Sequence, residues 1–526
     1  MSEPEQTLES RWKSTCKTVL GEEIGSLRQH LGSISLHTNP IIMKKSSISG
    51  KPVSYLLDFY AKDSKWISLD EINYDSRPEK IDLSGAKSLE SIAKLTNGVA
   101  YYCGNVVIGN SGNVAGSSNI MDCHYLLNCT QIGNSKYLVH CTLGRECEDC
   151  FGGNAVAESR SCIRCHETTR DSRSFELWMS QSCSDCYYSF GLRNCQDCIF
   201  CFNLRNKRYC VGNVQVSKGE YETIKKKVIS QAVKQLKESG SAPSMFDLIS
   251  RSSMQKEALP QMPAAPEEKT DKSVVEEAFK STSKILFGFQ LSGGLDTYSS
   301  WLGAYIHPTE FLNSCLSGRR IALTHYSNYN ILPHERMVSL EEAYFLGERL
   351  SLSKEDALSL DLNNAHKKIG KLVYIASEWS EGSKSNLTDC NIYIDAVDCY
   401  RVAGAIYSKK CGYCFWPKSS ESCFGSDTLF SSSSCIRCYY STKLSRCFEL
   451  DSCSNCSDCY FSHNIENCAE CMFCFNVKAL KYAIGNVQYP KEEYLRLKKL
   501  MLGDIFQRLE KDKKLDVNIF NLGCKK

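Results

Sequence analysis

The sequence predicts a mainly β protein, a tandem duplication of a β-solenoid with about eighteen residues per coil and with cysteine ladders along each axis. Three observations lead to this prediction. The chain repeats itself at a fixed offset of 273 in residue number, its cysteines keep a three-residue register, and a longer cysteine period of eighteen runs through both copies. Each solenoid is expected to follow a mixed α/β leader and to end in a helical cap.

Composition limits the class of protein. A chain of 526 residues can bury large cores, and 63 Lys and Arg against 60 Asp and Glu leave a net charge of +3. That balance argues against a strongly basic nucleic-acid surface, so nucleic acid is not an expected partner. We find no apolar run long enough to span a membrane, and the acidic N-terminus does not resemble a secretory signal. The expected location is intracellular and cytoplasmic, or a virion if the protein is viral.

The duplication is read from gapless matches. Cys162-Ile163-Arg164-Cys165 recurs as Cys435-Ile436-Arg437-Cys438, and Cys183-Ser184-Asp185-Cys186-Tyr187 recurs as Cys456-Ser457-Asp458-Cys459-Tyr460. Internal repeats of this kind define the unit that folds. We therefore expect residues 1–238 and 273–526 to fold independently.

A weaker echo upstream pairs residues 67–71 with residues 338–342, so the leaders also belong to the repeat. Between the copies, a stretch rich in Ser, Pro and charge has the composition of a linker. The predicted division is a leader at 1–119, a solenoid at 120–216, a capping helix at 217–238, a linker at 239–272, a leader at 273–390, a solenoid at 391–489 and a capping helix with tail at 490–526.

The cysteine register excludes simple helices and flat strands. A three-residue step drifts around a helix of 3.6 residues per turn, and strand faces alternate with period two. A solenoid fits, because equivalent residues of successive coils stack about 4.8 Å apart. Six residues on each of three sides would give eighteen, and the sequence leaves the handedness open. The predicted columns at this period are Cys129, Cys147, Cys165, Cys183 and Cys201; Cys435, Cys453 and Cys471; and Cys438, Cys456 and Cys474.

Open solenoid ends expose unpaired strand edges and need covering. An amphipathic run begins at Ser217 and places Tyr221, Ile224 and Val228 near helical spacing. A second run follows Pro490, a residue suited to the first turn of a helix. We expect both runs to be capping helices, with a helix that binds a partner as the alternative.

The 31 cysteines allow three interpretations. Packing of reduced thiols as small apolar groups is the preferred one, and it predicts that Cys456→Ser costs more than Cys456→Ala, because a buried hydroxyl needs a partner. Disulfides between coils are a second interpretation, which a reducing compartment disfavours. Zinc is the third, because paired Cys-x2-Cys segments resemble a ribbon site. The candidate zinc ligands are Cys435, Cys438, Cys453, Cys456, Cys471, Cys474, Cys162, Cys165, Cys183, Cys198 and Cys201.

A glycine-rich segment suggests a different chemistry. The apolar residues 284–291, followed by Ser292-Gly293-Gly294-Leu295-Asp296-Thr297, resemble the pyrophosphate loop of ATP pyrophosphatases such as argininosuccinate synthase. In such a loop a strand precedes backbone amides that bind phosphate. The first copy has no counterpart, and the roughly one hundred residues before the second solenoid are few for a nucleotide-binding domain. A glycine-rich turn is therefore the preferred interpretation.

The end of each repeat carries a family resemblance. Residues 198–221, with Leu204-Arg205-Asn206-Lys207-Arg208-Tyr209-Cys210 and Glu220-Tyr221, resemble the closing segment of uncharacterised cysteine-rich repeat proteins of uncultured bacteria. The resemblance covers the last coils and the cap of each copy. It implies a coil-and-cap fold and no known activity. The zinc-ribbon-like start of many such relatives is not found, so the resemblance does not imply zinc.

The sequence therefore predicts a non-enzymatic structural or protein-interaction scaffold, for example a component of a large assembly such as a virion or capsid. Its expected partners are other proteins, and no catalytic or cofactor-binding residue is assigned. Two alternatives remain. One is a zinc-binding regulatory or nucleic-acid-associated protein, and the other is an ATP-dependent enzyme built on Ser292–Thr297.

Overall fold

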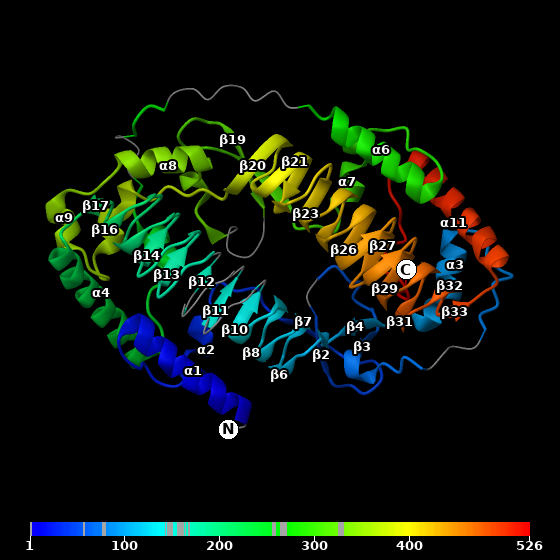
Figure 1. Ribbon diagram of the computed structural model, residues 1–526, viewed down its shortest axis with the longest axis horizontal. Helices are drawn as coiled ribbons and strands as arrows, with labels where there is room; N and C mark the ends of the chain where they lie inside the picture. Colours follow the sequence, from blue (N-terminus) through cyan, green and yellow to red (C-terminus); the bar gives the residue numbers. More distant parts are fainter. Residues whose placement is uncertain are drawn as a thin grey trace.

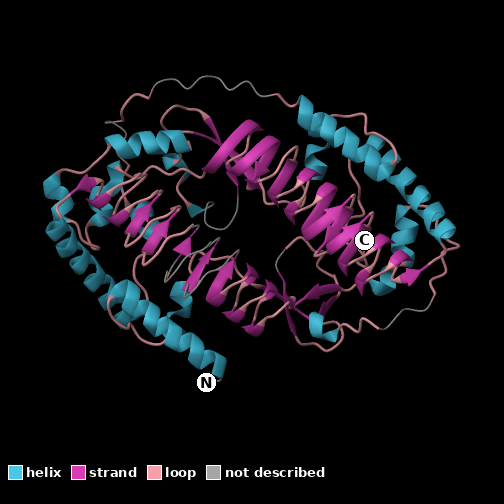
Figure 2. Cartoon of the chain, viewed as in Figure 1, coloured by secondary structure: helices cyan, strands magenta, loops and turns pink. Residues whose placement is uncertain are grey.

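The computed structural model contains two stacks of parallel strands with helices along their outer sides (Figures 1 and 2). We call the stacks coil 1 and coil 2, and we call one circuit of the backbone around a stack a turn of the coil. The predicted mainly β class and the C-terminal helix are both present. The structure describes residues 3–55, 58–75, 80–142, 144, 151–154, 163, 165–166, 169–254, 259–262, 271–324 and 331–525.

Short strands build both coils. Coil 1 consists of β5 (Val107–Ile108), β6 (Gly112–Ala115), β7 (Ser118–Met121), β8 (His124–Leu127), β9 (Thr130–Gly133), β10 (Lys136–Thr142), β11 (Phe151–Asn154), β12 (Cys165–His166), β13 (Phe175–Trp178), β14 (Tyr187–Phe190), β15 (Gln196–Ile199), β16 (Arg208–Val211) and β17 (Val214–Gln215). Coil 2 consists of β20 (Trp379–Thr388), β21 (Ile392–Ala403), β22 (Ala405–Ile406), β23 (Gly412–Lys418), β24 (Glu421–Phe424), β25 (Asp427–Phe430), β26 (Ser433–Ser445), β27 (Phe448–Asp451), β28 (Ser454–Ser457), β29 (Tyr460–Glu466), β30 (Ala469–Met472), β31 (Phe475–Lys478), β32 (Lys481–Ile484) and β33 (Val487–Gln488).

The strand register corrects the predicted coil length. Phe175 pairs with Tyr187 and Cys423 pairs with Cys435, a spacing of twelve positions, and this spacing holds along both coils after a first step of thirteen. Each turn of coil 1 and of coil 2 is therefore twelve residues long. The predicted eighteen-residue repeat is wrong. A separation of eighteen residues is one and a half turns, so cysteines that far apart in sequence lie on opposite sides of the coil.

A backbone corner at every third residue explains the three-residue register. From Asp395 to Gly485, and from Arg170 to Gly212, each third residue has a φ between 44° and 75°. Each twelve-residue turn therefore has four corners, and the residue after each corner faces the interior of the coil. Positive φ is costly for side chains with a Cβ, so this backbone persists only where the stacked coils enforce it.

The inward positions carry small and aliphatic side chains. In coil 2 the buried inward residues are cysteines, serines, alanines, valines, leucines and isoleucine. Steps of twelve place seven cysteines in one unbroken column, namely Cys399, Cys411, Cys423, Cys435, Cys447, Cys459 and Cys471. Cysteine and serine use the same hydrogen bonds here, because Cys399 Sγ and Ser408 Oγ each donate to the carbonyls two residues before and nine residues after them.

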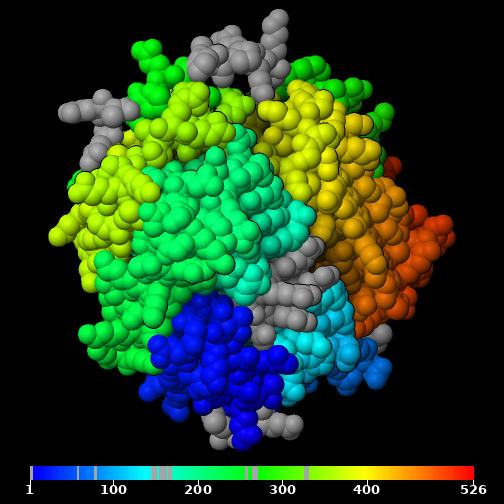
Figure 3. All heavy atoms as spheres, turned by 60° about the vertical axis from the view of Figure 1, so that its left-hand side comes forward, coloured from blue at the N-terminus to red at the C-terminus, as the bar shows by residue number. Residues whose placement is uncertain are grey.

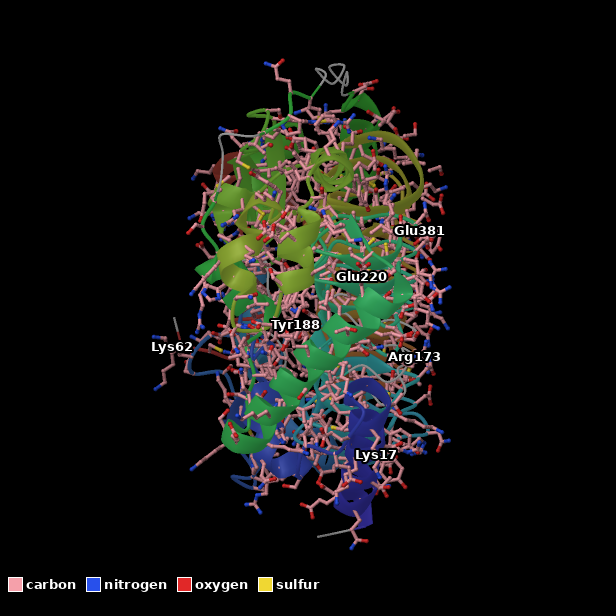
Figure 4. The ribbon with its side chains drawn as sticks, turned by 90° about the vertical axis from the view of Figure 1, so that its left-hand side faces the viewer. Lys17, Lys62, Arg173, Tyr188, Glu220 and Glu381 are labelled. Atoms are coloured by element: carbon pink, nitrogen blue, oxygen red, sulfur yellow. The ribbon has the colours of Figure 1, made fainter. Side chains whose placement is uncertain are left out.

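Helices cover one side of each coil. Beside coil 1 lie α1 (Glu3–Leu20), α2 (Leu27–Ile34), α4 (Lys218–Ser239) and α5 (Met245–Arg251). Figure 4 shows this side, with Lys17 on α1 and Glu220 at the start of α4. Beside coil 2 lie α6 (Ser273–Phe287), α7 (Ser299–Leu302) and α11 (Lys491–Asp512).

The predicted capping helices are present, but α4 lies along its coil instead of across the end. The Tyr221 hydroxyl donates to the Asp185 carbonyl (3.0 Å), two turns back from β16. The predicted linker is also shorter than expected, because it contains α5, whose Met245 and Ile249 are fully buried. Residues 255–258 and 263–270 of that linker lie outside the described residues.

A compact module from each half covers the coil of the other half. The first module, residues 42–104, contains β1 (Ile42–Lys45), β2 (Pro52–Tyr55), β3 (Trp66–Ser68), α3 (Leu89–Leu95) and β4 (Tyr102–Gly104), and it packs against coil 2. The second module, residues 309–377, contains β18 (Thr309–Asn313), β19 (Arg320–Thr324), α8 (Leu340–Arg349), α9 (Lys354–Ser359) and α10 (Ala365–Lys368). Figure 3 shows it, in yellow-green, against coil 1.

The two modules share their internal construction, as the sequence echo predicts. Each begins with an antiparallel hairpin, and each has a serine that caps the following helical turn. Ser46 donates to the Glu71 carboxylate (2.8 Å), and Ser314 donates to the Glu342 carboxylate (2.6 Å). The duplication therefore includes the leaders.

The module contacts are reciprocal, and both partners of each contact are shifted by 273 in residue number. Asn203 Nδ2 of coil 1 donates to the Tyr374 carbonyl (2.8 Å), and Asn476 Nδ2 of coil 2 donates to the Tyr101 carbonyl (2.7 Å). The same shift relates two helix contacts. The Leu362 amide donates to Gln231 of α4 (2.9 Å), as the Leu89 amide donates to Asp504 of α11 (2.8 Å).

Each large hydrophobic core therefore contains residues of both halves. One core joins Phe202 of coil 1 to Ile375 of the second module, and the other joins Phe475 of coil 2 to Tyr102 of the first module. This arrangement gives a physical reason to doubt independent folding of residues 1–238 and 273–526. Either half alone would expose the surface that the opposite module covers.

The interior hydrogen bonds reverse the expected order of two substitutions. Cys456 is buried, and its thiol donates to the carbonyls of Ser454 (3.1 Å) and Ile465 (3.5 Å). Serines at 408, 420 and 432 occupy the same column. We expect Cys456→Ser to keep both hydrogen bonds and to lower the unfolding free energy by less than Cys456→Ala, with a difference of about 1 kcal/mol. Denaturant midpoints measure this order, and a more stable Ala variant would contradict it.

Candidate functional site

The segment Ser292–Thr297 lies in a turn between two helices. Residues 284–287, which the pyrophosphate-loop hypothesis places in a strand, belong to α6, and Gly288 ends that helix with φ +80°. The expected strand before the loop is therefore wrong.

Carboxylates of the chain itself occupy the amides of this turn. The Ser292 amide donates to Glu510 Oε1 (2.7 Å), and its hydroxyl donates to the other oxygen of Glu510. The Leu295 amide donates to Glu276 Oε2 (2.7 Å). A phosphate would have to displace two acidic side chains, so the turn functions here as the joint between α6 and α11.

Asp296 is also engaged in a local network. Lys272 donates to its carboxylate at 2.7 Å, and the hydroxyls of Tyr413 (2.6 Å) and Tyr400 (3.3 Å) reach the same group. Burial raises the pKa of Asp296, but these three hydrogen bonds outweigh it and leave the pKa below its usual value. The carboxylate connects Lys272, just before α6, to Tyr400 and Tyr413 in the first turns of coil 2.

The predicted zinc ligands do not come together as the sequence suggested. The register places Cys435 and Cys471 in the seven-cysteine column and Cys438 and Cys474 in a neighbouring column. Cys453 and Cys456 lie on the opposite sides of the twelve-residue turn, so the predicted stacking of one Cys-x2-Cys pair over the next is wrong. Cys456 contacts the side chains of Cys459 and Cys468 instead, which are three and twelve residues away.

The coil 1 candidates are spread in the same way. Cys183, Cys198 and Cys201 follow one another on three different columns and are buried. Cys162 and the side chain of Cys165 lie outside the described residues. Within the part of the chain that the structure describes, no group of three or more His, Cys, Asp or Glu has a geometry that could hold a metal ion.

Burial raises the pKa of several interior thiols, whereas hydrogen bonds from neighbouring cysteines lower the pKa of Cys411 and of Cys435. Burial raises the pKa of Cys447 and of Cys453 well above the usual thiol value, and it raises the pKa of Cys390 to about 12. Protonated thiols donate to the coil carbonyls, whereas a metal ligand must be a thiolate. Cys390, Cys447 and Cys453 therefore fit the packing interpretation.

A buried ion pair lies where the sequence predicted only a repeated motif. Arg437 and Glu449 occupy successive turns of coil 2 and are 1% and 0% exposed, and the guanidinium contacts both Glu449 and the Trp301 carbonyl. Glu449 also accepts the Ile519 amide (2.9 Å). In the first half, Glu176 accepts the Met245 amide (2.7 Å) in the same way. Each glutamate thus accepts a hydrogen bond from the segment that follows a long helix, α4 in the first half and α11 in the second.

A second buried polar cluster lies between coil 2 and the first module. His463 Nδ1 is 2.7 Å from Asp451, the Tyr60 hydroxyl donates to the same carboxylate (2.5 Å), and the Cys103 amide donates to His463 Nε2 (2.8 Å). Their wide separation in sequence hid this cluster, because Tyr60 and Cys103 belong to the other half of the chain.

A hollow between coil 1 and the second module is lined by Phe190, Asn203, Tyr344, Glu378 and Trp379 among others. Its volume of about 250 Å³ includes open solvent. None of the predicted site residues lines it.

Comparison with known proteins adds no relative. No protein-family model, no curated protein and no solved structure matches the chain. Among the described residues, no helix is both long and apolar enough to cross a membrane. The site must therefore be interpreted from its own geometry.

The occupied turn makes a prediction about nucleotide. A ligand that binds the folded state raises the melting temperature in proportion to ln(1 + [L]/Kd). Because Glu510 and Glu276 already hold the turn amides, we expect millimolar MgATP to leave the melting temperature unchanged. Differential scanning fluorimetry tests this, with Asp296→Ala as the matched variant. A rise that disappears in Asp296→Ala would contradict the interpretation.

The buried ion pair makes a prediction about stability. Removing one partner of a buried pair leaves an uncompensated charge and typically costs about 3–5 kcal/mol. We expect a loss of this size for Glu449→Gln in denaturant unfolding, because Arg437 is buried. Glu381→Gln is the control. It breaks the exposed pair with Arg170 and should cost less than about 1 kcal/mol. Equal losses would show that burial does not determine the cost.

Proposed function

We propose that the protein is a rigid, non-enzymatic scaffold that binds other proteins through the outer faces of its two coils. The observation that supports this proposal most directly is the reciprocal packing of the modules. Because each core contains residues of both halves, the two coils would move as one body. A rigid body can present separate binding surfaces at fixed positions.

The exposed corners of coil 2 supply a regular surface for such contacts. Every twelfth residue from Asp395 to Ala479 is exposed, which gives a straight row along the coil. Successive residues of the row lie about 4.8 Å apart. Most side chains of the row are polar, and Tyr407 is its one aromatic residue; the others are Asp395, Ser419, Ser431, Lys443, Asn455, Asn467 and Ala479. Repeat proteins commonly bind partners through extended surfaces of this kind.

Further observations favour a scaffold over an enzyme. The coil interiors are filled by packed side chains, and the buried Arg437, Glu449, Asp451 and His463 all bond across contacts that hold the fold together. Assembly into a larger structure, such as a virion or capsid, is one setting in which such a body would act. Zinc binding remains an alternative, and metal analysis of the purified protein tests it directly.

Cleaving the chain between its halves tests the rigid body. A site-specific protease sequence placed at residues 263–270 allows the full chain to fold before it is cut. We expect the two fragments to co-elute at the mass of the intact chain, 59.2 kDa, because both module contacts persist. The matched control is the same cleaved protein with Asn203→Ala and Asn476→Ala, which should dissociate at higher concentration. Folded fragments that elute separately from the parent protein would contradict the proposal.

A further inference from the structure

His463 lies at the contact between coil 2 and the first module and is fully buried. It belongs to β29, and its hydrogen-bond partner Asp451 belongs to β27 in the preceding turn of coil 2. The amide that reaches its other ring nitrogen comes from Cys103 in β4 of the first module. One ring nitrogen therefore bonds within the coil, and the other bonds across the module contact.

These two hydrogen bonds define the protonation state of the ring. An amide N–H can only donate, so Nε2 must be the acceptor and the proton must reside on Nδ1, where it is donated to Asp451 (2.7 Å). The ring is thus neutral when the module is docked. A doubly protonated imidazole is a donor at both nitrogens and cannot accept from Cys103.

The first half has no equivalent group. Subtracting 273 from His463 and Asp451 gives Phe190 and Trp178, and the residue that corresponds to Cys103 is Ala376. Phe190 and Trp178 are both buried in the core that coil 1 shares with the second module. The contact between coil 1 and the second module keeps the Asn203 hydrogen bond to Tyr374 but places apolar residues where coil 2 has His and Asp.

We propose that the contact between His463 and Cys103 is proton-sensitive, so that acid releases residues 42–104 from coil 2 while residues 309–377 stay on coil 1. A proton added at Nε2 sets two N–H donors against each other across the contact. The same proton strengthens the pair of His463 with Asp451, which lies within coil 2 and survives release of the module. The lost acceptor for the Cys103 amide favours the open state, whereas the His463–Asp451 pair is present in both states and does not oppose release. This inference does not depend on the scaffold proposal.

The groups that surround the ring support this direction. Tyr60 and Tyr102 of the first module lie against His463, with ring centroids 6.4 and 5.3 Å away, and Phe475 of the coil lies at 5.8 Å. Burial raises the pKa of Tyr60, of Tyr102 and of the Cys103 thiol. These three groups therefore stay neutral and uncharged in acid, and Asp451 is the charged group that faces the ring.

A second histidine of this half would respond in the opposite sense. His307 Nδ1 and its own amide both contact Asp427 of β25, at 2.7 and 3.0 Å. Protonation of His307 strengthens this contact. It joins the segment before β18 to coil 2 and does not involve residues 42–104.

Hydrogen–deuterium exchange of the full chain tests the proposal. Exchange at pH 5 and pH 8, corrected for the intrinsic pH dependence of amide exchange, is compared between the β3–β4 region of the first module and residues 373–377 of the second. We expect the corrected rate at Cys103 to rise by about tenfold or more at pH 5. The second module should change little and serves as the internal control.

The matched variant is His463→Gln. A glutamine can accept from Cys103 and donate to Asp451 but cannot take up a proton, so it should hold the module closed at both pH values. Should this variant not fold, the comparison of the two modules in the wild-type chain still decides. Equal opening of both modules, no acid response at Cys103, or an unchanged response in a folded His463→Gln protein would each overturn the proposal.

Discussion

The rest of the structure depends on a backbone corner of positive φ at every third residue. Four such corners close each twelve-residue turn, and the closed turn determines which residues face the interior of the coil. Only side chains of limited size fit a coil this narrow, and a polar one needs a nearby carbonyl. Cysteine and serine meet both conditions, as the equivalent bonds of Cys399 and Ser408 show. The cysteine content thus follows from the backbone geometry.

This constraint explains what the sequence could predict. The three-residue register coincides with the backbone corners, so a mainly β fold with inward-facing cysteines could be predicted from the sequence. The number of residues per turn could not, because twelve and eighteen are both multiples of three and leucine or serine interrupts several columns. Between Cys438 and Cys474 the inward column continues through Leu450 and Ser462. Reading cysteines alone therefore hid the true period.

The sequence repeat could not predict that each module packs against the coil of the other half. The constant offset in residue number shows that two units exist but not which leader covers which coil. The packing follows from contacts such as Asn476 with Tyr101, which join residues far apart in sequence. The Glu449 and His463 clusters were missed for the same reason, because their partners come from distant segments. The glycine-rich turn was misleading, because local sequence did not show that Glu510 fills it.

The two halves share their geometry but not their chemistry at the module contacts. Both keep the asparagine that binds a module carbonyl, at 203 and at 476. They differ one turn earlier, where Phe190 corresponds to His463. The coil 1 contact has no histidine at Phe190 to take up a proton, whereas the neutral His463 loses its hydrogen bond from the Cys103 amide when it is protonated. Because the coil 2 contact contains this histidine and the coil 1 contact has Phe190 in its place, the pseudo-symmetric body would open on one side without separating into halves.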